Sequence, residues 1–196
     1  MSTLSTCSGF AISALLLACL APGASAMDGS NGNTSVTDLP PADNVGGSRI
    51  VADQDLDFID YAASAGKYEI ESSQYVVASG LTGDARTFAE AMAADHFVIT
   101  NRLKTLLGKK GLAIPERMTF DDRVAISRLK DTREDQLGKA YVGAQVKAQT
   151  AEIKLYTDEA AKGVDAELRA FAQSNLPLLQ KQLEKAQLIA GGGQIQ

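Results

Sequence analysis

Four segments of this chain carry their core-type residues at alternating steps of four and three, which places those residues on one face of an α-helix. The segments lie near residues 53–80, 83–111, 133–162 and 165–189. An amphipathic helix in water buries its apolar face against another element. The spacing therefore predicts an all-α domain in which four long helices share one core.

The connection between the second and third of these helices is about 20 residues long, "GLAIPERMTFDDRVAISRLKD". A structureless link of that length is unusual in a compact domain, so we expect it to cross the bundle and to contain a short helix. Thr119 is placed to open that helix, with Asp122 three residues later in the capping-box position. The prediction is a four-helix bundle with a long crossover between helices 2 and 3.

The first 26 residues predict a secretory signal peptide. They contain no charged side chain, include an apolar run and end in "ASA". Cleavage after Ala26 makes Met27 the first residue of the mature chain and removes both cysteines, Cys7 and Cys19, which excludes disulfides and thiol catalysis. An alternative is a lipoprotein signal, with a lipid anchor on Cys19.

The rest of the chain divides by composition into three parts. Residues 27–52 are rich in Gly, Ser, Asn, Asp and Pro and predict a flexible linker. Residues 53–190 form the predicted helical domain. Residues 191–196, "GGGQIQ", predict a flexible tail.

Charge and motifs exclude several classes of function. With 196 residues, a net charge of −5 and no basic stripe, the chain is not expected to bind nucleic acid. A single histidine does not support a Ser-His-acid triad, and neither a phosphate-binding loop nor a CxxC or HExxH motif occurs. We therefore expect that the protein is not an enzyme.

Each long helix carries a polar side chain on or beside its apolar face, near its own midpoint. The faces are expected to be apolar otherwise, with Val142, Val146, Ile153 and Tyr156 on the third helix. Buried polar groups cost free energy unless they bond to one another, so we expect these side chains to meet in one layer. The layer consists of Glu69, Asp95, His96, Gln149 and Gln182.

Two interpretations of this layer differ in function. The favoured one is a hydrogen-bonded layer that fixes helix register, with no cofactor. The alternative is a small-ligand site or a metal or redox site at Glu69, Asp95 and His96, holding Zn or Fe weakly. A dinuclear carboxylate site would use Glu-x-x-His pairs, but Ala93 stands three residues before His96, and Gln is a weak ligand for transition metals.

Five stretches between residues 53 and 190 resemble the bacterial envelope proteins grouped as domain of unknown function 4142. They are "DLDFIDYAASAGKYEIESSQ", "FAEAMAADHFVITNRL", "KGLAIP", "AYVGAQVKAQTAEIKLY" and "LRAFAQSNLPLLQKQLEKA". Asp95-His96 falls on that family's Asp-His pair, and Leu176-Pro177 on its Leu-Pro. The resemblance implies a ferritin-like bundle and an envelope location, and it supplies no reaction.

The chain departs from this family at two positions. Ala148-Gln149 stands where the family has a second Asp-His, and Gln182-Leu183 where it has His-Leu. A family metal site built on those histidines would be impaired here. The sequence as a whole predicts a non-catalytic exported protein of the periplasm or outer membrane, with a binding or structural role and an envelope or membrane-associated partner.

Overall fold

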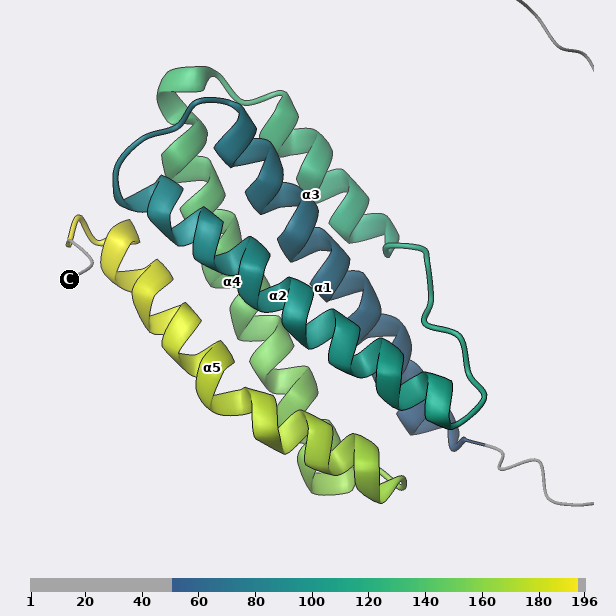
Figure 1. Ribbon diagram of the computed structural model, residues 1–196. Helices are drawn as coiled ribbons and strands as arrows, with labels where there is room; N and C mark the ends of the chain where they lie inside the picture. The colour runs from purple at the N-terminus through teal and green to yellow at the C-terminus, as the bar shows by residue number, and fades with distance from the viewer. Residues whose placement is uncertain (1–50, 194–196) are drawn as a thin grey trace, which may run out of the picture. The chain divides into compact units, whose positions relative to one another are not determined.

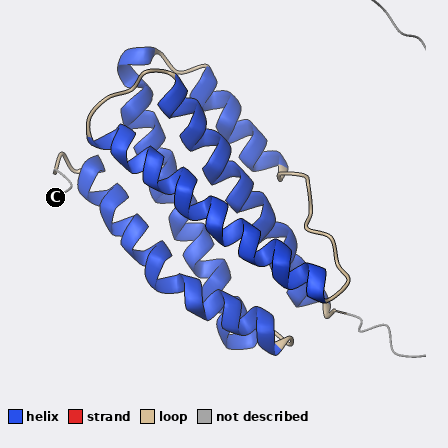
Figure 2. Ribbon diagram, viewed as in Figure 1, coloured by secondary structure: helices blue, strands red, loops and turns tan. Residues whose placement is uncertain are grey.

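A computed structural model describes residues 51–193, which form five α-helices and contain no strand (Figures 1 and 2). The expected signal peptide with Cys7 and Cys19, residues 27–50 of the expected linker and residues 194–196 lie outside the described residues. The helices are α1 (Asp53–Ala78), α2 (Asp84–Lys109), α3 (Phe120–Lys130), α4 (Glu134–Lys162) and α5 (Ala166–Ala190).

The helix ends follow from local chemistry that the sequence displays. Gly80 and Gly111, just beyond α1 and α2, have φ angles of 77° and 73°, in the left-handed region that glycine tolerates. The Thr119 side chain accepts a hydrogen bond from the Asp122 backbone N–H and caps α3, as predicted. Asp165 caps α5 through the backbone N–H groups of the first turn.

The four long helices lie lengthwise against one another. α1 packs against α2 and α4, and α5 packs against α4 and α2 (Figure 1). The connection from α2 to α4 contains α3, which contacts both α1 and α4. No helix among residues 51–193 is both long and apolar enough to cross a bilayer.

The apolar core consists of two clusters at opposite ends of the helices. One includes Phe58, Leu103, Tyr156, Leu168 and Phe171, with Phe58 and Tyr156 in edge-to-face contact at 5.2 Å between ring centroids. The other includes Val76, Phe88, Met92, Tyr141 and Ala186. Between the clusters, at the midpoints of the helices, the buried side chains are polar.

Gly66 lies where α1 approaches α2 closely. A Cβ atom at this buried position would collide with Oγ1 of Thr100 on α2. Gly143, in the middle of α4, has no atom within 4 Å of the equivalent position. Substituting alanine at each of the two glycines therefore tests how tightly α1 packs against α2.

We expect Gly66→Ala to lower the free energy of unfolding by about 1–2 kcal/mol, because overpacking outweighs the gain in helix propensity. Gly143→Ala, the matched control, should raise it by about 0.5–1 kcal/mol. Urea denaturation followed by circular dichroism measures both. A rise of similar size in both variants would show that α1 and α2 lie further apart than described.

Candidate functional site

The predicted polar residues lie at the middle of the bundle, and four of the five are buried. Glu69 on α1, His96 on α2 and Gln149 on α4 are at most 1% exposed, and Gln182 on α5 is 3% exposed. Asp95, the neighbour of His96 on α2, is half-buried. Each long helix thus contributes to one layer between the two apolar clusters.

The side-chain amide of Gln149 links Glu69 and His96. Its Nε2 lies 3.5 Å from Glu69 Oε1 and 3.2 Å from His96 Nε2. An amide nitrogen carries two hydrogens, so one group can donate to both acceptors. When Gln149 donates to both, His96 Nε2 accepts, and the neutral imidazole carries its proton on Nδ1, a buried atom without a hydrogen-bond partner.

A second amide connects α5 to α2 at the edge of the layer. Gln182 Nε2 donates to Asp95 Oδ2 at 3.0 Å. Asp95 therefore joins the layer through Gln182, whereas Glu69 and His96 are linked through Gln149. The contacts do not unite Glu69, Asp95 and His96 in one centre.

Burial favours the neutral forms of His96 and Glu69. Desolvation lowers the pKa of His96 to about 4, and the nearby side-chain amide of Gln182 acts in the opposite direction. Desolvation also raises the pKa of Glu69 well above its usual value, and the nearby Glu152 carboxyl raises it further. Hydrogen bonds from Gln145 and Gln149 to Glu69 oppose this shift.

Glu152 on α4 belongs to the site and was not predicted from the sequence. It is 3% exposed, and its Oε2 lies 3.9 Å from His96 Nε2, too far for a hydrogen bond. Burial, with a contribution from Asp122, raises its pKa to about 8. Gln145, also missed, is fully buried and donates to Ser72 Oγ at 3.3 Å.

The expected apolar face of α4 was wrong in part. Val142 and Tyr156 are buried, but Val146 and Ile153 are only half-buried. A second series with the same spacing turns inward instead, and it shares Gln149 and Tyr156 with the first. Its members are Gln145, Gln149, Glu152, Tyr156 and Glu159. Its 4-3-4-3 spacing is present in the sequence, but four of its five members are polar, so it does not form an apolar face.

Several acceptor atoms of the layer lack a hydrogen-bond partner. They are Glu69 Oε2, both carboxyl oxygens of Glu152, and the amide oxygens of Gln145, Gln149 and Gln182. Oxygens without donors attract a proton or another cation. Within residues 51–193, however, no three or more His, Cys, Asp and Glu side chains are placed to hold one metal ion. The donor set therefore does not fit a transition metal well.

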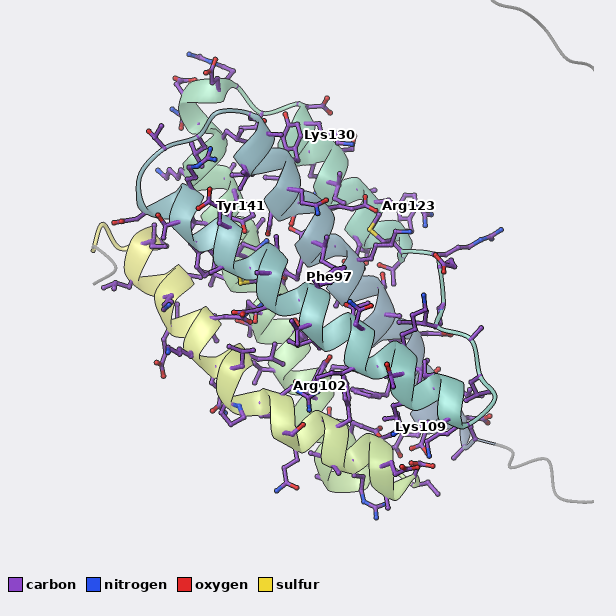
Figure 3. The ribbon with its side chains drawn as sticks, in the orientation of Figure 1. Phe97, Arg102, Lys109, Arg123, Lys130 and Tyr141 are labelled. Atoms are coloured by element: carbon purple, nitrogen blue, oxygen red, sulfur yellow. The ribbon has the colours of Figure 1, made fainter. Side chains whose placement is uncertain are left out.

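Outside the layer, Arg102 joins α2 to α5 (Figure 3). It donates to Asn175 Oδ1 and to Ser174 Oγ, each at 3.1 Å, and lies 5.8 Å from the centre of the Phe171 ring. Arg102 therefore helps to hold α5 against α2 beside the layer.

Comparison with known proteins gives a family and a fold. The model of the family described as "Domain of unknown function (DUF4142)" matches residues 41–189. No curated protein matches the chain. A crystal structure of a DUF305 fragment from Deinococcus radiodurans superposes with a TM-score of 0.64 at 9% identity, covering 72% of this chain and 98% of the fragment. At that identity the similarity concerns the fold alone.

The raised pKa of Glu152 predicts how stability depends on pH. Between about pH 4.5 and 8 the folded chain holds a proton on Glu152 that the unfolded chain releases, so stability falls as pH rises through this range. We expect Glu152→Gln to reduce the loss of unfolding free energy between pH 5 and pH 9 by about 2–4 kcal/mol. Denaturation at a series of pH values measures it.

Glu184→Gln, which removes an exposed carboxyl of α5, is the control and should follow the natural protein. Parallel pH profiles for all three proteins would mean that Glu152 has an ordinary pKa.

Proposed function

Because the chain belongs to the family described as Domain of unknown function (DUF4142), a description that names no activity, we propose its function from its own residues. The proposal is a non-catalytic exported protein of the bacterial envelope with a binding or structural role. The observation that carries it is the buried layer, in which Gln149 connects three of the four long helices.

The proposal includes the finer assignment of the fold as a ferritin-like four-helix bundle. Four long helices packed lengthwise support it, as does the connection of residues 110–133 between α2 and α4, with α3 as the crossover. In ferritin-like bundles the centre of the helices is the usual place for a metal site. In this chain the same place holds amides and carboxyls that bond to one another.

Burial supports the absence of catalysis. A general acid or base has to come within hydrogen-bond distance of its substrate. His96 is fully buried, Glu69 is 1% exposed, and the nitrogen His96 would use as a base already accepts from Gln149. A buried layer of this kind has a structural role, because each amide fixes the register of the helices that it joins.

Export is proposed from the leader alone. An uncharged apolar segment ending in "ASA" is the signal of a secreted chain, so the proposed location is the periplasm or the outer membrane, with a lipid on Cys19 as the alternative anchor. The proposed partner is a component of the envelope or a membrane-associated protein, not nucleic acid, as the net charge of −5 supports.

The second candidate function is metal binding or redox chemistry at Glu69, Asp95 and His96, with Zn or Fe. Unpartnered carboxyl oxygens of Glu69 and Glu152 beside the single imidazole favour it. Against it stand the amide-linked geometry and the weakness of Gln as a ligand. The two candidates predict different affinities for Zn(II) in the natural protein, and replacing Gln149 and Gln182 with His tests them.

We expect the natural protein to bind Zn(II) no more than weakly, and the variant Gln149→His, Gln182→His to bind at least tenfold more tightly. The variant would place two further imidazoles beside His96, which gives a set that divalent transition metals favour. Isothermal titration calorimetry measures both affinities, and metal analysis of the purified proteins measures occupancy.

A variant with two added histidines on the surface, Gln136→His and Gln187→His, controls for binding by imidazole alone, since both positions are exposed. Tight stoichiometric Zn(II) in the natural protein would favour the second candidate. No gain over this control would mean that the side chains at 149 and 182 do not converge on His96.

A further inference from the structure

A groove runs along α4 on the side that faces α3. Its upper part, about 700 Å³, lies between α3 and the first half of α4, near Lys139. Its lower part, about 440 Å³, lies further along α4, near Glu152, and extends to α1 beyond the first turn of α3. Tyr68, Asp121, Asp122 and Ala148 line both parts, so they form one groove. Small residues of α4 form its floor, namely Ala140, Gly143, Ala144, Ala148 and Ala151.

The two ends of this groove carry opposite charge. Arg128, Lys139 and Lys147 line the upper part. The lower part is lined by Asp121, Asp122, Glu152 and Asp158, with Lys154 as its only basic lining residue. Lys154 is already paired with Asp158 at 2.5 Å. Within the described chain, Asp121, Asp122 and Glu152 make no ion pair with a lysine or arginine. Asp122 Oδ2 accepts hydrogen bonds from the Ser64 and Thr119 hydroxyls, and its negative charge has no cationic partner.

Glu152 links the groove to the buried layer. It lines the lower part of the groove, yet it is 97% buried and neither carboxyl oxygen has a hydrogen-bond partner. Its contact with the neutral His96, at 3.9 Å, is too long for a hydrogen bond. Turning the carboxyl toward the groove therefore breaks no hydrogen bond.

The chemistry of the lower end selects among cations. Unpartnered oxygens require N–H or O–H donors, which a primary ammonium group supplies and a quaternary ammonium group lacks. A metal ion would need several converging ligands, and no such set exists in residues 51–193. Tyr61 and Tyr68, which line the same end, provide aromatic faces that attract a cation.

We propose that this groove binds a primary alkylammonium compound, with the ammonium group between Glu152 and Asp122 and the alkyl chain along the alanine floor toward α3. The inference deepens the binding role proposed above and rests on it. The basic residues at the upper end repel the ammonium group, so the ligand lies in one direction only.

Hexylamine tests the proposal by isothermal titration calorimetry on the purified natural protein. The titration is made at pH 8.5, because burial raises the pKa of Glu152 to about 8 and hexylamine is still protonated there. Hexan-1-ol, hexanoate and hexyltrimethylammonium have the same chain and a different head group. We expect measurable binding of hexylamine and binding at least tenfold weaker for the other three.

Two variants locate the site. Glu152→Gln keeps the shape of the side chain and should weaken hexylamine binding about tenfold or more, the loss expected for one charge-assisted hydrogen bond. Ala148→Leu fills the floor and should weaken it without changing any charge. Glu159→Gln is the matched control, a buried carboxyl on the same helix that does not line the groove, and should stay within about twofold.

No binding of hexylamine, equal binding of hexanoate, or equal loss in Glu152→Gln and Glu159→Gln would each overturn the inference. If Glu152→Gln does not fold, as judged by circular dichroism, Ala148→Leu and the head-group series still decide. The two proposals can fail separately. If hexylamine does not bind and the natural protein binds no Zn(II), the groove proposal is wrong and the proposed layer without a metal stands.

Discussion

The amide of Gln149 is the interaction on which the centre of this bundle depends. It lies within 3.5 Å of Glu69 on α1 and within 3.2 Å of His96 on α2, so a single side chain of α4 serves two other helices. Without it, two polar groups, Glu69 and His96, would be buried with fewer partners, each at a cost of about 1–3 kcal/mol. The apolar clusters on either side supply most of the stability, whereas this bond determines which residues face one another.

The same centre contains more acceptors than donors. Glu69 and Glu152 sit near each other without a lysine or arginine bonded to either, and the imidazole beside them is neutral. The folded chain resolves this excess by holding protons on carboxyls whose pKa is raised. Where Glu152 approaches the surface beside Asp122, a ligand with N–H donors can take the place of the proton. The buried layer and the groove are therefore coupled through the charge of one residue, Glu152.

The sequence predicted the helices well because their ends carry strong local signals. Thr119 caps α3 as expected, although its own backbone N–H donates to Ser64 and not to Asp122, and glycines with positive φ follow α1 and α2. Glu69, His96, Gln149 and Gln182 were found because each interrupts an apolar face. Glu152 was missed because α4 has two overlapping series with the same spacing, and only the neighbours decide between them. The alanines of α4 face the groove beside α3, and the series that includes Glu152 faces the other long helices.

The titration of His96 tests the central claim most directly. The chain has one histidine, so its imidazole signals in a proton NMR spectrum need no assignment by mutation. A buried imidazole that accepts from Gln149 should titrate with a pKa of about 4, well below the ordinary 6.5, while circular dichroism shows that the helices persist. A pKa of 6.5 or higher in the folded protein would mean that His96 is solvated or paired with an ionised carboxylate, and would contradict the neutral layer.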